Sequence, residues 1–384
     1  MIDEKQLTSY FLELVAIDSV SRKERDIALK LKGDLEALGA TVTIDDAGDK
    51  VHGNVGNLIA RVPGTVPGLS PLLLSAHMDT VVPGEGVKAI VEGSVVHTDG
   101  TTILGADDKS GLAIIIQVLR TLKEQSIPYG DIEVVFTICE EKGLLGAKNL
   151  DTSVLKARYG LVLDCDEVGS LFIKGPAANH MEWRIFGLES HAGVAPERGI
   201  NAIRIASEGI AAMTLGRIDP ETTANVGVIT GGAATNIVPN QVAVHGEARS
   251  HDVAKLEAQT QHMTRCLEEA AARYSVTVDG QTYTGLVETT VNRAYDPMNV
   301  SEDSAIAKLV QRAGENLGVP ITLGATGGGC DANIFNGVGM LVANLGTGMR
   351  GIHTVKESID LRDLHRAANL VLEVVRLSGD GLLD

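Results

Sequence analysis

The sequence has few basic side chains, with 33 lysine and arginine residues against 50 aspartate and glutamate residues and a formal net charge of -17. Nucleic acids and anionic membrane surfaces are bound mainly through patches of lysine and arginine. This deficit argues against either one as the main partner. An acidic surface suits the binding of multivalent cations, although it more often serves solubility.

Long apolar runs are also missing, and none approaches the ~20 residues that a membrane-spanning helix needs. Residues 1–21 are acidic and lack the basic-then-apolar order of a secretory signal. The four cysteines form no C-x-x-C pair and are far apart, so they are interpreted as reduced thiols rather than a disulfide framework. We therefore expect a cytoplasmic protein without a membrane partner.

The apolar pattern predicts an α/β fold, in which a mixed, mostly parallel sheet is flanked by helices. Strands of the sheet that are buried on both faces read as continuous apolar runs, which residues 71–76 and 159–163 show. Further predicted strands cover residues 41–44, 57–62, 131–139 and 337–345, and predicted helices cover residues 4–14, 24–38, 112–119, 301–317 and 360–375.

The texture of the sequence changes after Gly175. Residues 176–290 alternate strand and helix patterns in the order strand, helix, strand, strand, helix, strand, which is typical of a small α+β layer. We expect this segment to be an inserted domain. Residues 1–175 and 291–384 would then form the two parts of one catalytic, metal-binding domain.

Several predicted strands and one predicted helix carry metal-ligand residue types at their ends. His77 and Asp79 follow strand 71–76, Asp107 and Asp108 precede helix 112–119, Glu140 and Glu141 follow strand 131–139, and Asp164 follows strand 159–163. Ligands of open α/β sheets gather at the carboxyl ends of the strands. Each instance alone has an ordinary explanation, such as helix capping by an aspartate. Together they predict a cation site, because adjacent carboxylates repel each other unless a positive charge lies between them.

These segments occur in the order of a known signature. It comprises His77-Met78-Asp79-Thr80-Val81, Gly105-Ala106-Asp107-Asp108-Lys109-Ser110-Gly111, Glu140-Glu141-Lys142-Gly143, Asp164 and a late His353. In this the chain resembles the M20 family of dizinc metallopeptidases and aminoacylases over nearly its whole length. The glycine loop Gly327-Gly328-Gly329-Cys330 makes it most similar to the peptidase T-like branch, whose members are tripeptide aminopeptidases.

The resemblance implies a role for each residue of the signature. His77 and Asp164 would hold one zinc ion, Glu141 and His353 would hold the other, and Asp107 would bridge the two. Cobalt or manganese could replace zinc. Asp79 would orient His77, and Glu140 would be the general base toward the attacking water. The Asp107–Asp108 peptide bond is expected to be cis.

The resemblance also implies a substrate site and a partner. The inserted domain would be a ferredoxin-like lid through which a homodimer forms. His191 would stabilise the oxyanion, either in its own subunit or across the dimer. Asn236 and Arg249 would hold a short peptide, with the backbone of Gly327, Gly328 and Gly329 beside its carboxylate. Arg249 could also be a plain surface residue of a strand, and His191 a plain loop residue.

Other functions remain open at this point. An N-acyl amino-acid deacylase or a carboxypeptidase could use the same dizinc centre. Cys330 stands where related chains often carry Ser or Thr, which leaves the fine substrate preference open. Gly346-Thr347-Gly348-Met349-Arg350-Gly351 matches a dinucleotide-binding fingerprint, but no apolar helix follows it. A binding protein without catalysis would have no structural reason to retain Glu140 beside the ligand set.

Overall fold

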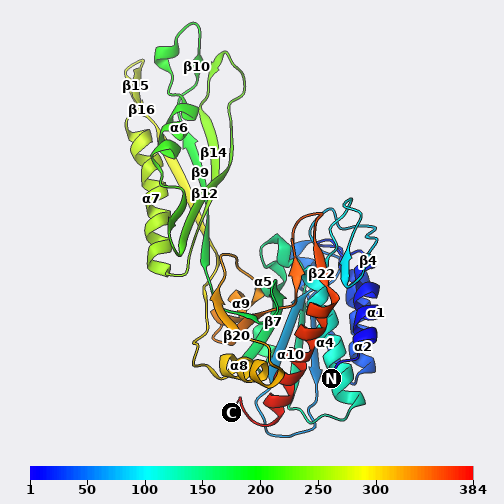
Figure 1. The fold of residues 1–384 in the computed structure, drawn as a ribbon. Coiled ribbons are helices and arrows are strands. Elements are labelled where there is room, and N and C mark those ends of the chain that lie inside the picture. Colours follow the sequence, from blue (N-terminus) through cyan, green and yellow to red (C-terminus); the bar gives the residue numbers. More distant parts are fainter. Residues whose placement is uncertain (384) are drawn as a thin grey trace. The chain divides into compact units, whose positions relative to one another are not determined.

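The computed structural model describes residues 1–383 and divides the chain into two compact units (Figure 1). The first unit comprises Met1–Gly175 and the chain from Met298 onward, and the second comprises Pro176–Pro297. We expected the return to the first unit at residue 291. The chain stays longer in the second unit because strand β17 (Leu286–Tyr295) pairs with a neighbouring strand as far as Tyr295.

The first unit is built on a nine-stranded mixed sheet with the order β1-β2-β6-β3-β7-β20-β8-β18, in which β19 also pairs with β8. Strands β6, β3, β7 and β20 are neighbours and run parallel to one another, as expected for a mostly parallel α/β sheet. The strands are β1 (Thr41–Ile44), β2 (Leu58–Val62), β3 (Leu72–His77), β6 (Ile132–Thr137), β7 (Tyr159–Cys165), β8 (Ser170–Gly175), β18 (Met298–Asn299), β19 (Thr322–Ala325) and β20 (Leu341–Gly346).

Helix α4 (Ala106–Glu124) lies between this sheet and an outer layer of helices. It contacts β3 and β7, and α1 and α10 pack against it (Figure 1). Its residues from Leu112 to Leu119 are all buried, because both faces of the helix are covered. The other helices are α1 (Glu4–Val15), α2 (Arg25–Ala37), α3 (Ala47–Val51), α5 (Leu145–Asn149), α8 (Ala305–Leu317), α9 (Asp331–Gly337) and α10 (Leu361–Gly379). None of the helices within residues 1–383 is long and apolar enough to cross a membrane.

His353 lies between two strands of a small four-stranded sheet. Its order is β21-β22-β5-β4, formed by Met349–Arg350, Ser358–Asp360, Val95–His97 and Ile90–Glu92. The glycine-rich run from Gly346 to Gly351 therefore enters a hairpin, β21 to β22, and opens no helix. A dinucleotide fingerprint requires a helix at this point, so the structure removes that alternative.

The second unit is a five-stranded antiparallel sheet, β11-β12-β14-β9-β17, packed against two helices. Its main chain order β9-α6-β12-β14-α7-β17 gives the ferredoxin-like arrangement that the sequence predicted. Trp183 on β9 is fully buried in its core. The elements are β9 (Ala177–Phe186), β10 (Ser190–His191), α6 (Ala202–Ala212), β11 (Gly216–Asp219), β12 (Thr222–Gly231), β13 (Ile237–Val238), β14 (Gln241–Ser250), α7 (Val253–Ala272), β15 (Ser275–Val278), β16 (Gln281–Thr284) and β17.

Candidate active site

Three neighbouring parallel strands deliver side chains to one edge of the large sheet. His77 is the last residue of β3, and Asp164 lies near the end of β7. Glu140 and Glu141 begin the short 3-10 helix η1 (Glu140–Lys142), just after β6. Because β6, β3 and β7 are adjacent and parallel, their carboxyl ends meet, and the four side chains converge there.

The start of α4 adds a further carboxylate. Asp107 and Asp108 have non-helical backbone angles, and the peptide bond between them is cis, as expected. The Asp108 carboxylate accepts hydrogen bonds from the backbone N–H groups of Gly111 (3.0 Å) and His77 (3.2 Å). Asp108 thus caps the regular part of the helix. Asp107 is left to face the cluster.

Two sets of ligand atoms share Asp107. In the first, His77 Nε2 lies 2.9 Å from Asp107 Oδ1 and 3.8 Å from Asp164 Oδ1. In the second, His353 Nε2 lies 3.1 Å from Asp107 Oδ2 and 2.9 Å from Glu141 Oε1. Within each set the ligand atoms lie within 4.8 Å of one another. The structure brings the five predicted metal ligands together in the two predicted combinations.

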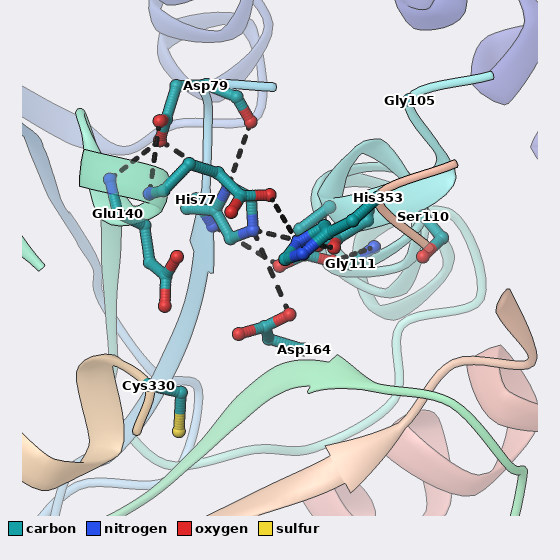
Figure 2. Close-up of polar contacts among 12 residues, drawn as sticks. His77, Asp79, Gly105, Ser110, Gly111, Glu140, Asp164, Cys330 and His353 are labelled. Atoms are coloured by element: carbon teal, nitrogen blue, oxygen red, sulfur yellow. Dashed lines mark hydrogen bonds and ion pairs between the residues drawn. The ribbon is translucent and has the colours of Figure 1, made fainter. Parts of the chain in front are cut away.

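Glu140 stands apart from these two sets. It can form a third set with His77 and Glu141, but that set reuses one residue from each of the others. Glu141 lies 2.9 Å from His353, whereas the Glu140 carboxylate takes part in none of the ion pairs found within residues 1–383. Figure 2 shows contacts only at the backbone nitrogen of Glu140, and its carboxylate is left without a dashed contact. Glu140 is therefore free to act on something other than a metal ion.

Asp79 is fully buried and holds the segment that carries both glutamates. Its carboxylate accepts hydrogen bonds from the backbone N–H groups of Glu140 (2.8 Å) and Glu141 (3.3 Å) and from Ser21 Oγ (2.7 Å). We expected this carboxylate to orient His77. The closer partner of His77 Nδ1 is instead the backbone carbonyl of Asp79, at 2.9 Å, and the carboxylate lies at 3.5 Å.

The two histidines of the cluster strongly favour their charged form. Burial alone lowers the pKa of His77, but contacts with Asp107 and Asp79 outweigh it and raise that pKa well above its ordinary value. Contacts with Asp107 and Glu141 raise the pKa of His353 to about 10. The pKa of Asp107 is correspondingly lowered, because its contacts with His353 and His77 exceed the effect of burial.

Other carboxylates of the cluster resist ionisation. Burial raises the pKa of Glu140 well above its ordinary value, and the nearby charges of Asp331 and Glu141 add to this effect. Burial likewise raises the pKa of Asp164, and Asp107 contributes to it. So many buried acids cannot all be charged at neutral pH without further positive charge between them.

The residues present fit divalent cations. Imidazole nitrogen and carboxylate oxygen are the usual ligands of catalytic zinc. Glu141 Oε1 is buried and accepts no hydrogen bond from any residue in the range 1–383, yet it lies 2.9 Å from His353 Nε2. Such a short distance without a hydrogen bond is what two ligand atoms of the same metal ion would show.

Residues 73–377 match the family model described as peptidase family M20/M25/M40. The chain belongs to this peptidase family. The M20 chain is also 43% identical to the uncharacterized protein YqjE of Bacillus subtilis, over 98% of this chain and 99% of that one.

Two solved structures are similar to the M20 chain. Aminopeptidase PepT of Bacillus cereus is 40% identical, with a TM-score of 0.89 over 98% of this chain and 99% of that one. A tripeptidase of Staphylococcus aureus is 38% identical, with a TM-score of 0.92 over 99% and 100%. The M20 chain is thus a metallopeptidase of the peptidase T-like branch.

Two of the predicted substrate residues lie at one end of the second unit of this M20 chain. His191 in β10 and Asn236, just before β13, are exposed, and Ala192 N–H donates to the Asn236 carbonyl (2.9 Å). His191 Nδ1 accepts a hydrogen bond from Gly193 N–H (3.2 Å). This bond favours the tautomer with its proton on Nε2.

The other predicted substrate residues are elsewhere. Arg249 in β14 is half-buried, and Glu247 accepts two hydrogen bonds from its guanidinium, each 3.1 Å long. The residues of the glycine loop, Gly327, Gly328 and Gly329, belong to the first unit, where Gly328 N–H donates to Thr326 Oγ1 (3.1 Å). The Glu247 partner was not predicted, although residues two apart on a strand share a face.

Three buried acids beside the M20 site were also missed from sequence. Asp331 has one carboxylate oxygen bonded to Thr137 Oγ1 and the other without a partner within residues 1–383. Glu24 accepts a hydrogen bond from Cys139 N–H (3.0 Å), just before Glu140. Glu357 bonds to the backbone before α4. No local pattern marks these acids, because the partners that tie them to the site (Thr137, Cys139 and the backbone before α4) are distant in the chain.

Proposed function

We propose that this chain is an aminopeptidase that removes the N-terminal residue of short peptides, with tripeptides as the preferred substrates. The observation that carries the proposal is that Asp107 is common to two ligand sets, beside a glutamate that belongs to neither of them. Such a pair of sets is suited to two metal ions bridged by one carboxylate. The names of the similar B. cereus and S. aureus proteins support the substrate class.

Each set would hold one zinc ion, with cobalt or manganese as substitutes. His77 and Asp164 would bind one ion, Glu141 and His353 the other, and Asp107 both. When bound, the ions lower the pKa of a water molecule and polarise the scissile carbonyl. The ligand atoms come from the ends of packed strands and from a helix start, so this chain supplies a rigid site for them.

Glu140 would be the general base. It accepts the proton of the attacking water and later delivers it to the leaving amine. The burial that raises the pKa of Glu140 makes its carboxylate a stronger base than an exposed glutamate. Asp79 fixes where Glu140 stands by accepting the hydrogen bond of its backbone N–H.

The second unit would be the lid that binds the substrate. His191 would donate a hydrogen bond from Nε2–H to the carbonyl oxygen as charge develops on it. Arg249 would bind the peptide carboxylate through the two guanidinium nitrogens that here donate to Glu247, exchanging Glu247 for the substrate. The exposed Asn236 and the backbone of the glycine loop would complete the contacts.

The register of the second sheet supports a homodimer formed through this unit. Arg249 is paired with Ala178, whereas Gln241 is paired with Phe186 at the other end of β9, and His191 lies beyond that end. Eight residues of strand span roughly 26 Å, but a tripeptide spans only about 10 Å. His191 and Arg249 of one copy are therefore too far apart to touch the same tripeptide. We propose that His191 serves the site of a second copy.

The test of the catalytic assignment is Glu140→Ala. This variant should lose turnover and still bind two metal ions per chain. Retained turnover would contradict the role of Glu140, and loss of bound metal would show that Glu140 is a ligand.

A substrate panel tests the reaction class. The wild-type chain, loaded with Zn2+, Co2+ or Mn2+ after chelation, would be offered dipeptides, tripeptides and N-acyl amino acids, and the products identified. Cleavage of tripeptides from the amino end is the expected result. Deacylation alone, or removal of the carboxyl-terminal residue, would favour the deacylase or carboxypeptidase alternative.

A further inference from the structure

Glu357 is a buried carboxylate to which the signature assigns no role. It is only 1% exposed and follows His353 by four residues. Its Oε2 accepts hydrogen bonds from the backbone N–H groups of Leu104 (2.8 Å) and Gly105 (2.7 Å), and its Oε1 accepts one from Asp107 (2.9 Å). One side chain thus holds the backbone on both sides of Ala106.

The turn that carries Glu357 also carries His353. The flanking strands pair Met349 with Ile359, which closes the hairpin. Inside it, Glu357 N–H donates to the Thr354 carbonyl (3.0 Å), and Thr354 Oγ1 donates to the Gly351 carbonyl (2.7 Å). The histidine and the glutamate are therefore parts of one hydrogen-bonded turn.

The two segments joined in this way supply two ligands of the same proposed ion. Asp107 Oδ2 lies 3.1 Å from His353 Nε2, and the Glu357 carboxylate bonds to the backbone of Asp107 itself. A metal site tolerates only small errors in ligand position, and the groups that hold the ligands commonly affect metal affinity.

We infer that Glu357 is a positioning residue that sets the spacing of Asp107 and His353 for the ion that both would bind. The inference rests on the proposed function, because it takes these two residues as metal ligands. A carboxylate suits the task, since it has two accepting oxygens for three N–H donors. A glutamine would turn its own NH2 group toward one of these donors and leave a buried N–H unpaired.

Zn2+ titration of the metal-free chain tests this role. We expect Glu357→Gln to weaken the binding of one Zn2+ about 10- to 100-fold, the usual effect of disturbing a group that holds a ligand. Glu357→Asp keeps the charge but is one methylene shorter, so it cannot reach both Leu104 and Asp107, and its Zn2+ binding should also be weaker. This variant tests the inference if Glu357→Gln does not fold.

Glu133→Gln is the matched control. Glu133 is also buried, at 3% exposure, and accepts hydrogen bonds from the backbone N–H groups of Lys156 (2.8 Å) and Ala157 (2.9 Å). It is paired with Leu73 at the start of β3, whereas His77 ends that strand. A glutamine keeps both bonds, because they end on the same oxygen, and loses the ion pair of Glu133 with Arg61 (3.7 Å). This variant should therefore lower the unfolding temperature of the metal-free chain slightly and leave Zn2+ affinity unchanged.

The outcomes separate the inference from the proposed function. Weaker Zn2+ binding by the Glu357 variants than by Glu133→Gln supports the positioning role. Zn2+ binding by the Glu357 variants equal to that of the wild type, or a loss equal to that of Glu133→Gln, would overturn it while the proposed function stands. If the wild-type chain takes up no Zn2+, the proposed function fails and this inference fails with it.

Discussion

Replacing Asp79 with asparagine tests how the backbone of Glu140 and Glu141 is held in place. An asparagine that keeps its oxygen on the Glu140 N–H turns its NH2 group toward the Glu141 N–H, 3.3 Å from the present carboxylate. Ser21 can rotate its hydroxyl and accept from the new amide. The part-buried Glu141 N–H then loses its carboxylate partner.

The expected cost follows from that single lost bond. Leaving a buried donor unpaired costs about 1–3 kcal/mol, and the Glu141 N–H is only part-buried, so we expect the lower end of this range. We expect a loss of this size in the free energy of unfolding, measured by urea titration of the metal-free chain. A shift of Glu140 and Glu141 from their positions should also lower kcat about 10- to 100-fold, since ~1.4 kcal/mol corresponds to a factor of ten.

Asp252→Asn provides the control for this experiment. The Asp252 carboxylate also accepts two backbone N–H groups, at 2.7 and 3.3 Å, but it caps the exposed start of α7 in the second unit. Asparagine is as good a helix cap as aspartate, so neither stability nor kcat should change. Asp79→Asn with the stability and kcat of the wild type would refute the role of Asp79.

Two further predictions concern Glu24 and His191. Burial raises the pKa of Glu24, so the folded chain holds its proton to higher pH than the unfolded chain, and this group lowers stability as pH rises above the unfolded value of about 4.3. Glu24→Gln can keep its bonds to Arg22 and Cys139, because both end on one oxygen. Urea unfolding at pH 5 and pH 7.5 should therefore show this variant to be at least as stable as the wild type at pH 7.5. A greater loss of unfolding free energy at pH 7.5 than at pH 5 would contradict this. For His191, refolding a mixture of His191→Ala and Glu140→Ala copies should restore about a quarter of wild-type activity through random pairing, whereas no restoration would show that His191 acts in its own copy.

The sequence was sufficient for the large elements and for the residues that converge at the sheet edge. Continuous apolar runs predicted β3 and β7, and parallel strands must meet at their carboxyl ends, so His77 and Asp164 could be placed together from pattern alone. Asp107, Glu141 and His353 came from the ordered signature. The structure brings these five residues together, while their role as metal ligands stays a prediction.

The sequence pattern could not predict hydrogen bonds between side chains and backbone N–H groups that are distant in the chain. Cys139 takes a left-handed conformation (φ 50°), and this turn presents the N–H groups of Glu140 and Glu141 to Asp79. Cysteine is not among the non-glycine residue types enriched in this conformation, so the residue type does not indicate the turn. Glu357 was missed for a similar reason, because its partners are main-chain amides about 250 residues away.

The proposed ligands come from two segments of the chain that the second unit separates, and this has a consequence for synthesis of the chain. His77, Asp107, Glu141 and Asp164 all precede the second unit, and His353 follows it. The ribosome would synthesise these four proposed ligands well before the fifth. On the proposed assignment, a nascent or truncated chain could therefore assemble the ligand set of one ion, but not that of two. Full metal loading would report that the whole chain has been made and that both segments of the first unit have joined.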